Sequence, residues 1–161
     1  MVNRADLPPS TIRVAEAAEA LGHPIAIVVT EGSARTAEEA AAACGTSVAQ
    51  IVKSLVFVGA ESDRAILLLV SGRNRVNEKA VAEKLGEALK RPDAQRVRAE
   101  TGFAIGGIPP FGHSSTLITY IDPDLLTFPE VWAAAGTPNT VFPIAPERLK
   151  DLTRADVLAM G

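Results

Sequence analysis

The sequence has few of the residue types on which most catalytic and metal-binding motifs depend. It contains one cysteine, Cys44, and two histidines, His23 and His113. One cysteine cannot form an internal disulfide, and two histidines are too few for a site built from several imidazoles. The Gly-x-x-x-x-Gly-Lys-Ser/Thr loop, the Gly-x-Gly-x-x-Gly fingerprint and the His-Glu-x-x-His helix are all missing. These absences argue against zinc chemistry, nucleotide hydrolysis and dinucleotide redox chemistry, and we expect neither a cofactor nor a metal.

Long apolar runs and targeting signals are missing as well. The longest purely apolar run in the middle of the chain, 65–70, has six residues, whereas a membrane-spanning helix needs about 20. The first residues have neither the charged nor the apolar region of a secretory signal. We therefore expect a cytoplasmic protein with no membrane partner. Its 161 residues fit one domain, 1–161, in which 1–9 are expected to be loose.

Helix caps, glycine stops and apolar runs predict a chain in which helices and strands alternate. The predicted helices cover 10–21, 37–44, 77–90, 93–99 and 129–135, and a last one begins at Pro146. The predicted strands cover 24–30, 51–58, 65–71, 116–121 and 139–144. The short link 59–63 predicts an antiparallel hairpin, whereas helical crossovers join the other strands. The fold class is therefore predicted to be α+β, a single domain with a mixed, mostly antiparallel sheet.

Charge is distributed unevenly along the chain. The net charge is −3, which by itself argues against a nucleic-acid partner, and DNA is not expected. The segment 73–98, however, has eight basic residues against four acidic ones. That segment is therefore +4 and the rest of the chain −7. Such asymmetry can mark a surface that faces RNA. Glu83, Lys84 and Glu87 equally fit the solvated face of an ordinary amphipathic helix, so composition leaves both interpretations open.

Two features of the sequence point to a binding site. The segment Gly106–Gly112 has three glycines and two prolines in seven residues, so its backbone can approach a ligand closely and its shape is restricted in advance. Lys53 interrupts an apolar stretch, 51–57. Because an ammonium group is rarely buried without a partner, Lys53 either extends to solvent over its apolar neighbours or serves a ligand.

The remaining reactive side chains give weaker signals. His113 closes the glycine-proline loop, where it could hydrogen-bond a ligand or hold the backbone of the loop itself. His23 lies in a Gly-His-Pro turn, which needs no functional explanation. Cys44 ends an alanine-rich helix with no base near it in the sequence, so we interpret it as a packing residue.

Two motifs together resemble a known family. Ile51-Val52-Lys53-Ser54-Leu55, followed later by Gly106-Gly107-Ile108-Pro109-Pro110 and Phe111-Gly112-His113, is similar to the YbaK/ProX family of aminoacyl-tRNA deacylases. These are freestanding relatives of the editing domain inserted in bacterial prolyl-tRNA synthetases. The resemblance covers nearly the whole chain, to the closing segment 143–149. It implies a barrel-like sheet surrounded by helices, and an enzyme that removes the wrong amino acid from tRNA.

The resemblance also assigns roles to individual residues. It places Lys53 in the pocket and gives the positioning of the aminoacyl ester to the backbone of Gly106, Gly107, Ile108, Pro109 and Pro110. Ester hydrolysis builds negative charge on the carbonyl oxygen, which loop N–H groups and an ammonium can stabilise. The family is thought to use a hydroxyl of the terminal ribose to assist water, which fits the missing Ser/His/Asp arrangement. Lys53 is expected to hold a phosphate or the ester, because a lysine pKa of about 10.4 does not suit a general base.

The expected substrate is mischarged tRNA, held at its acceptor end. Size exclusion would select the amino acid, with pocket-wall and substrate-binding candidates Ile51, Val29, Phe103, Ile108, Gly112 and His113. Arg73 and Arg75 are the candidates for contact with the acceptor stem. An aminoacyl-tRNA synthetase is a second candidate partner. Two alternatives remain: a module that binds aminoacyl-tRNA or a nucleotide without hydrolysis, and a regulatory partner of a synthetase. The sequence leaves the identity of the amino acid open.

Overall fold

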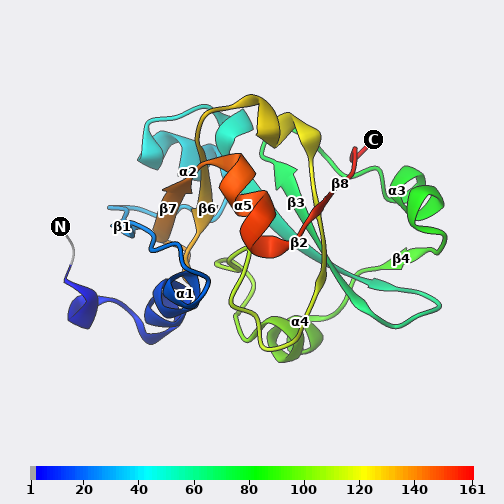
Figure 1. Ribbon diagram of the computed structural model, residues 1–161, viewed down its shortest axis with the longest axis horizontal. Coiled ribbons are helices and arrows are strands. Elements are labelled where there is room, and N and C mark those ends of the chain that lie inside the picture. The colour runs from blue at the N-terminus through cyan, green and yellow to red at the C-terminus, as the bar shows by residue number, and fades with distance from the viewer. Residues whose placement is uncertain (1–2) are drawn as a thin grey trace.

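Two β-sheets with helices packed around them make up the computed structural model, which describes residues 3–161 (Figure 1). The α-helices are α1 (Pro9–Ala20), α2 (Ala37–Cys44), α3 (Glu78–Leu85), α4 (Ala94–Thr101) and α5 (Pro146–Thr153). The strands are β1 (Val28–Val29), β2 (Val52–Gly59), β3 (Ala65–Ser71), β4 (Leu89–Lys90), β5 (Ile118–Ile121), β6 (Val131–Ala134), β7 (Thr140–Ile144) and β8 (Asp156–Val157). Short 3₁₀ turns cover η1 (Arg4–Asp6), η2 (Val48–Gln50) and η3 (Pro123–Thr127).

The larger sheet is mixed, in the order β4-β2-β3-β5-β8. Strands β2 and β3 form the antiparallel hairpin that the short link between them predicted, and β4 pairs antiparallel with the far end of β2. Strand β5 pairs parallel with β3 and β8 parallel with β5. A parallel neighbour requires a long crossover, which the segment containing α3, β4 and α4 supplies. The predicted α+β class with a mixed sheet is confirmed.

The smaller sheet is antiparallel, in the order β1-β7-β6. A parallel bridge between Ile51 and Trp132 joins it to the larger sheet, beside the start of β2. Among residues 3–161 the strands do not close into a barrel, in contrast to the barrel-like sheet that was expected. The physical reason is that two-residue strands, β1, β4 and β8, lie at sheet edges and offer little backbone for further pairing.

Strand β3 packs against the hydrophobic core on both of its faces, since all seven of its residues are buried. Leu67 and Leu69 pack with Phe142 and the small sheet, whereas Ile66 and Leu68 pack on the opposite side. A strand buried on both faces reads as a continuous apolar run rather than an alternating one. This accounts for the uninterrupted run 65–70 in the sequence.

Helix α2 begins and ends where its sequence signals predict. The Thr36 hydroxyl accepts the Glu39 N–H at 3.1 Å and the Glu39 carboxylate accepts the Thr36 N–H at 3.2 Å, which completes a capping box. Gly45 ends the helix with φ +66°, a conformation that favours glycine. These local contacts fix where the chain before α2 runs across the molecule.

We predict that Thr36→Ala lowers the free energy of unfolding by about 1 kcal/mol, because the cap then loses its acceptor for the Glu39 N–H. Urea denaturation followed by circular dichroism measures this change. Thr116→Ala is the matched control, since Thr116 is exposed and lies outside every helix. Equal losses in the two variants would contradict the assigned capping role.

Several boundary predictions were wrong. The helix predicted over 129–135 is strand β6, because pairing with β7 overrides the helix preference of its alanines. The helix predicted over 77–90 ends at Leu85, since Gly86 adopts φ +83° and β4 follows. The predicted strand 24–30 pairs only at Val28–Val29 and is exposed there. Strand β8 was not predicted.

The segment expected to be loose, 1–9, falls partly outside the described residues. Within the described part, Leu7 is buried and the Arg4 guanidinium pairs with Glu19 at 2.7 Å. No helix within residues 3–161 combines the length and the apolar character that crossing a membrane would require.

Candidate functional site

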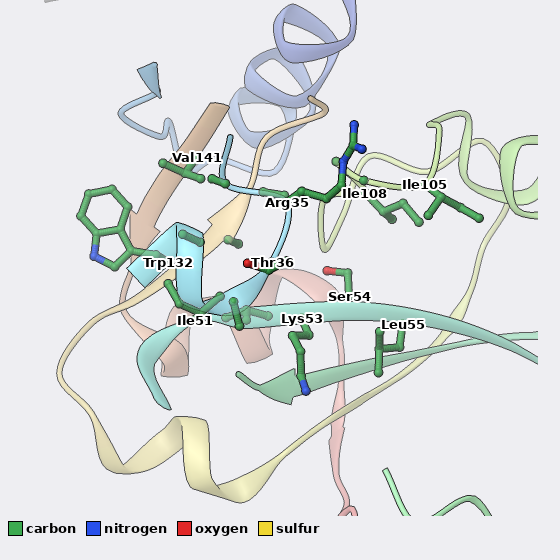
Figure 2. Close-up of a pocket in the computed structure, with 18 residues that line it drawn as sticks. Arg35, Thr36, Ile51, Lys53, Ser54, Leu55, Ile105, Ile108, Trp132 and Val141 are labelled. Atoms are coloured by element: carbon green, nitrogen blue, oxygen red, sulfur yellow. The ribbon is translucent and has the colours of Figure 1, made fainter. Parts of the chain in front are cut away.

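A pocket of about 490 Å³ opens where the two sheets meet (Figure 2). Its walls come from four parts of the chain that are distant in sequence: the entry to α2, the first half of β2, the glycine-proline loop and the small sheet. Apolar side chains, among them Ala37, Ile51 and Ile108, form most of the lining. The volume suits a small-molecule group enclosed on several sides.

The glycine-proline loop forms one side of this pocket through Gly106, Gly107 and Ile108. Gly107 packs so closely that a Cβ there would lie 2.6 Å from the Thr137 nitrogen and 2.7 Å from its Cα. The Gly107 carbonyl also accepts the Gly136 N–H at 2.8 Å. Only a residue without a side chain fits this backbone-to-backbone contact, which holds the loop against the turn before β7.

His113 fixes the other end of the loop. Its Nε2 donates to the Pro109 carbonyl at 2.7 Å, since a carbonyl oxygen can only accept. Burial lowers the pKa of His113 below its ordinary value. The sequence left open whether His113 hydrogen-bonds a ligand or holds the backbone of the loop. The structure contains the second of these contacts. Pro109 and Pro110 are buried behind the part of the loop that faces the pocket.

Lys53 and Ser54 leave β2 on opposite sides, as successive residues of a strand do (Figure 2). Ser54 points into the pocket, whereas the Lys53 ammonium donates to the Asn74 carbonyl oxygen. Burial is the main reason that the pKa of Lys53 lies below its ordinary value; the nearby charge of Arg75 lowers it too, while Glu38 opposes the shift. The ammonium therefore lies at the edge of the site, among charged groups.

The acceptor of the Lys53 ammonium is itself held in place. Asn74 Nδ2 donates to the Asp122 carboxylate at 2.8 Å and to the Asp124 carboxylate at 2.7 Å. Asp122 is only 2 % exposed and also accepts the Ser71 N–H at 3.1 Å. This network connects Lys53 to the ends of β3 and β5.

The Ser54 hydroxyl is unusual among buried polar groups. Its oxygen is buried, and it is the one such side-chain atom within residues 3–161 that has no hydrogen-bond partner. Buried polar groups are nearly always paired, and an unpaired one calls for an explanation. Sequence reasoning missed Ser54, although strand alternation next to Lys53 could have indicated that one of the two faces the pocket.

Arg35 lies across the pocket from Ser54 and was also missed. Its side chain is exposed, and its Nε approaches within 3.2 Å of the position that a Cβ on Gly106 would take. No ion pair involves Arg35 within the described part of the chain. A cation thus stands at the mouth of the pocket beside the loop.

Some predicted site residues lie away from this pocket. Val29 is on exposed strand β1, and Phe103 is buried in the core beneath the Arg13 guanidinium. Gly112, with φ +81°, packs against Ala17 of α1. Of the four candidates for the pocket wall, the structure brings together Ile51 and Ile108. The described residues contain no group of three or more His, Cys, Asp or Glu side chains placed to hold a metal ion.

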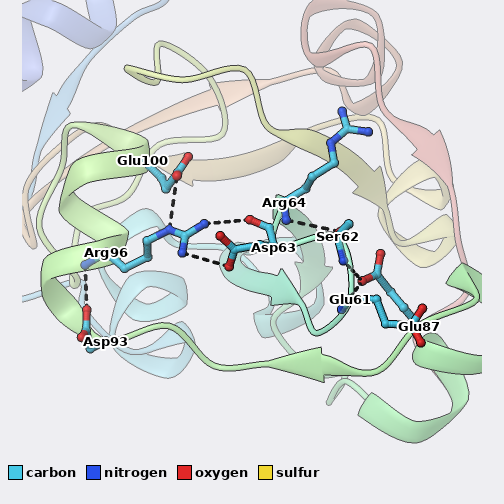
Figure 3. Close-up of polar contacts among 8 residues, drawn as sticks. All are labelled: Glu61, Ser62, Asp63, Arg64, Glu87, Asp93, Arg96 and Glu100. Atoms are coloured by element: carbon cyan, nitrogen blue, oxygen red, sulfur yellow. Dashed lines mark hydrogen bonds and ion pairs between the residues drawn. The ribbon is translucent and has the colours of Figure 1, made fainter.

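The basic segment 73–98 divides into two parts. The Arg96 guanidinium forms ion pairs with Asp63 at 3.3 Å and with Glu100 at 3.2 Å (Figure 3). The ion pair with Asp63 connects α4 to the β2–β3 turn. The Glu87 carboxylate accepts two N–H groups of the same turn, from Glu61 and Ser62, each at 2.9 Å (Figure 3). These contacts hold the fold together.

The other part of the basic segment is free to meet a partner. Arg73 and Arg75 are exposed, and no ion pair involves either of them within residues 3–161. Arg75 is near enough to Lys53 to affect its pKa. The two arginines thus extend the charged edge of the site.

Comparison with known proteins identifies what this arrangement is similar to. The model of the aminoacyl-tRNA editing domain family matches residues 31–152, a span that includes every residue lining the pocket. An uncharacterized protein of Bacillus subtilis (strain 168), YwhH, is 32% identical over 127 residues, which cover 79% of this chain and 80% of that protein.

Solved structures share the whole fold. A crystal structure of a proposed trans-editing enzyme for prolyl-tRNA synthetase is 48% identical, with a TM-score of 0.91 over 96% of this chain and 98% of that one. The crystal structure of hypothetical protein APE2540 is 27% identical, with a TM-score of 0.83 over 91% and 97% of the two chains.

Proposed function

The chain belongs to the aminoacyl-tRNA editing domain family, and from this we propose that it is a trans-editing hydrolase that removes the amino acid from mischarged tRNA. In the proposed reaction a water oxygen bonds to the ester carbonyl carbon and the bond from that carbon to the ribose oxygen breaks. The free amino acid and the terminal ribose hydroxyl are the products. The observation that carries the proposal is the glycine loop, held by close backbone contacts beside an apolar pocket.

The loop supplies the groups best suited to the developing negative charge. Its backbone at Gly106, Gly107 and Ile108 lines the pocket, and contacts with Gly136 and His113 hold it from behind. Backbone N–H groups that are fixed before the reaction stabilise an oxyanion without reorganising. We assign the stabilisation of the ester carbonyl to this backbone.

The side chains of the pocket supply no evident nucleophile with its base. The hydroxyls of Thr36 and Ser54 line it, but no histidine does. This favours a reaction in which the free hydroxyl of the terminal ribose positions the attacking water. In such a reaction the rate increases because the ribose hydroxyl holds the water close to the ester, and no activated side chain is needed.

We propose that the cationic side chains around the pocket bind the nucleic acid part of the substrate. Lys53 at the edge of the pocket and Arg35 at its mouth would hold the phosphate of the terminal adenosine. Arg73 and Arg75 would contact the acceptor stem. Because aminoacyl-tRNA is made and used in the cytoplasm, the proposal places the protein there.

A panel of charged tRNAs tests the proposal directly. We expect the protein alone to release the amino acid from at least one tRNA charged with alanine, cysteine, serine or threonine, and to spare correctly charged prolyl-tRNA. Release is measured as loss of acid-precipitable labelled amino acid. Binding without turnover across the panel would instead favour the module that only captures aminoacyl-tRNA. Turnover only in the presence of a synthetase would favour the regulatory partner.

We predict that reversing Arg73 and Arg75 to glutamate weakens tRNA binding about 10-fold or more and makes the affinity less dependent on salt, since phosphate contacts release counterions. Fluorescence anisotropy of labelled tRNA at several salt concentrations measures both effects. The matched control reverses Lys79 and Lys90, which lie on α3 and β4 and change the net charge equally. If both double variants bind alike, the assignment of the acceptor stem to Arg73 and Arg75 is wrong.

A further inference from the structure

The polar group inside the pocket indicates which kind of amino acid it accepts. We propose that Ser54 is a specificity-determining residue whose hydroxyl hydrogen-bonds the side chain of the aminoacyl group, so that the preferred substrate carries a small hydroxylated amino acid, serine or threonine. The inference rests on the proposed function and deepens it. It begins from the buried Ser54 oxygen, which has no partner within residues 3–161.

The surroundings of Ser54 leave it as the group available to a ligand inside the pocket. Its neighbours in the lining, among them Ala40, Ile51 and Ile108, have apolar side chains. The other lining hydroxyl, Thr36, already accepts the Glu39 N–H at 3.1 Å. The Lys53 ammonium is bonded to Asn74 on the opposite side of β2. Ser54 is therefore the side-chain hydroxyl of the lining whose oxygen has no hydrogen-bond partner among the described residues, so it can pair with a polar atom on the side chain of the aminoacyl group.

An unpaired hydroxyl discriminates between ligands of equal size. A ligand that supplies a hydrogen-bond partner removes the penalty of the buried oxygen, whereas an apolar ligand leaves that penalty in place. A site that hydrogen-bonds a substrate hydroxyl rejects an analogue without one far better than an apolar pocket separates two hydrocarbons. We expect one neutral hydrogen bond of this kind to give about 10- to 100-fold discrimination.

The α-ammonium group of the substrate is the competing partner for Ser54. It is present in every aminoacyl ester, so a contact with it would help all substrates equally. A contact with the side chain would help only the hydroxylated ones. The ratio of two rates therefore separates the two cases, whereas the rate for one substrate does not.

The decisive experiment compares one tRNA charged with serine and with 2-aminobutyrate, which has a methyl group in place of the hydroxyl. We expect the wild-type protein to hydrolyse the seryl ester with a kcat/KM at least 10-fold higher. In Ser54→Ala we expect that ratio to fall close to one, mainly through slower seryl hydrolysis. Ser115→Ala is the matched control, because Ser115 is exposed and outside the pocket lining, and it should keep the wild-type ratio.

The folded state of the variant is checked by its thermal unfolding midpoint. We expect no loss of stability, because Ser54→Ala removes a buried oxygen that has no partner. An unchanged ratio, or an equal fall for both esters, would overturn the assignment of Ser54 while leaving the proposed function standing. Wild-type protein that hydrolyses none of the charged tRNAs, alanyl-tRNA included, would overturn both.

Discussion

Gly107→Ala is expected to lower kcat/KM for ester hydrolysis by about 100-fold or more while the chain stays folded. The new Cβ would lie 2.6 Å from the Thr137 nitrogen and 2.7 Å from its Cα. Both are backbone atoms, which cannot turn aside as the end of a flexible side chain can. The loop must therefore move, and a displacement of about 1 Å in a positioning group can reduce a rate about 100-fold.

Gly32→Ala is the control for this loop variant. A Cβ on Gly32 meets nothing within 4 Å, so hydrolysis should remain at the wild-type rate. Circular dichroism and the unfolding midpoint establish that Gly107→Ala is folded before its rate is compared. Wild-type activity in folded Gly107→Ala would show that the loop does not position the ester, and the proposed mechanism would lose its main support.

Lys53→Ala should reduce kcat/KM by about 100-fold, comparable to the loss of one stabilising donor in other active sites. The reason is that the ammonium is held at the edge of the pocket by Asn74, where the anionic end of the tRNA would arrive. Steady-state deacylation of the best substrate in the panel, with tRNA affinity measured in parallel, separates a loss of binding from a loss of turnover.

Lys79→Ala provides the comparison for Lys53, because it removes the same charge from an exposed position on α3. We expect it to keep nearly full activity. If Lys53→Ala were no slower than Lys79→Ala, the ammonium would have a purely structural role on β2. The preserved hydrogen bonds of Asn74 to Asp122 and Asp124 should keep the Lys53 variant folded.

Local signals in the sequence were sufficient to predict many of the helices and strands. Helix α2 was predicted correctly because Thr36 and Gly45 determine its ends through contacts within a few residues. Strand β6 was mistaken for a helix because its alanines favour a helix locally, and its pairing with β7 depends on residues farther along the chain. Errors of this kind arise where tertiary contacts decide between two local preferences.

The candidate site was predicted only in part. Lys53 and the glycine loop were singled out from the residues themselves, and the family resemblance supplied their expected roles. Of the loop, Gly106, Gly107 and Ile108 line the pocket. The isolation of the Ser54 hydroxyl could not be predicted, because it depends on how the loop and the entry to α2 cross above β2. Phe103 is apolar like a pocket residue, and its place in the core depends on packing that the sequence does not display.

The alternation of Lys53 and Ser54 makes the chemistry of the site depend on strand register. In the β2–β3 hairpin Lys53 lies opposite Val70 and Ser54 opposite Leu69. A slip of one residue would exchange the faces of every side chain on β2. It would turn the ammonium into the apolar pocket and the hydroxyl away from it. The five-residue connection 60–64 that sets this register therefore determines which side chains of β2 face the pocket. An insertion there that shifted the register would change the charge inside the pocket without any substitution in its lining.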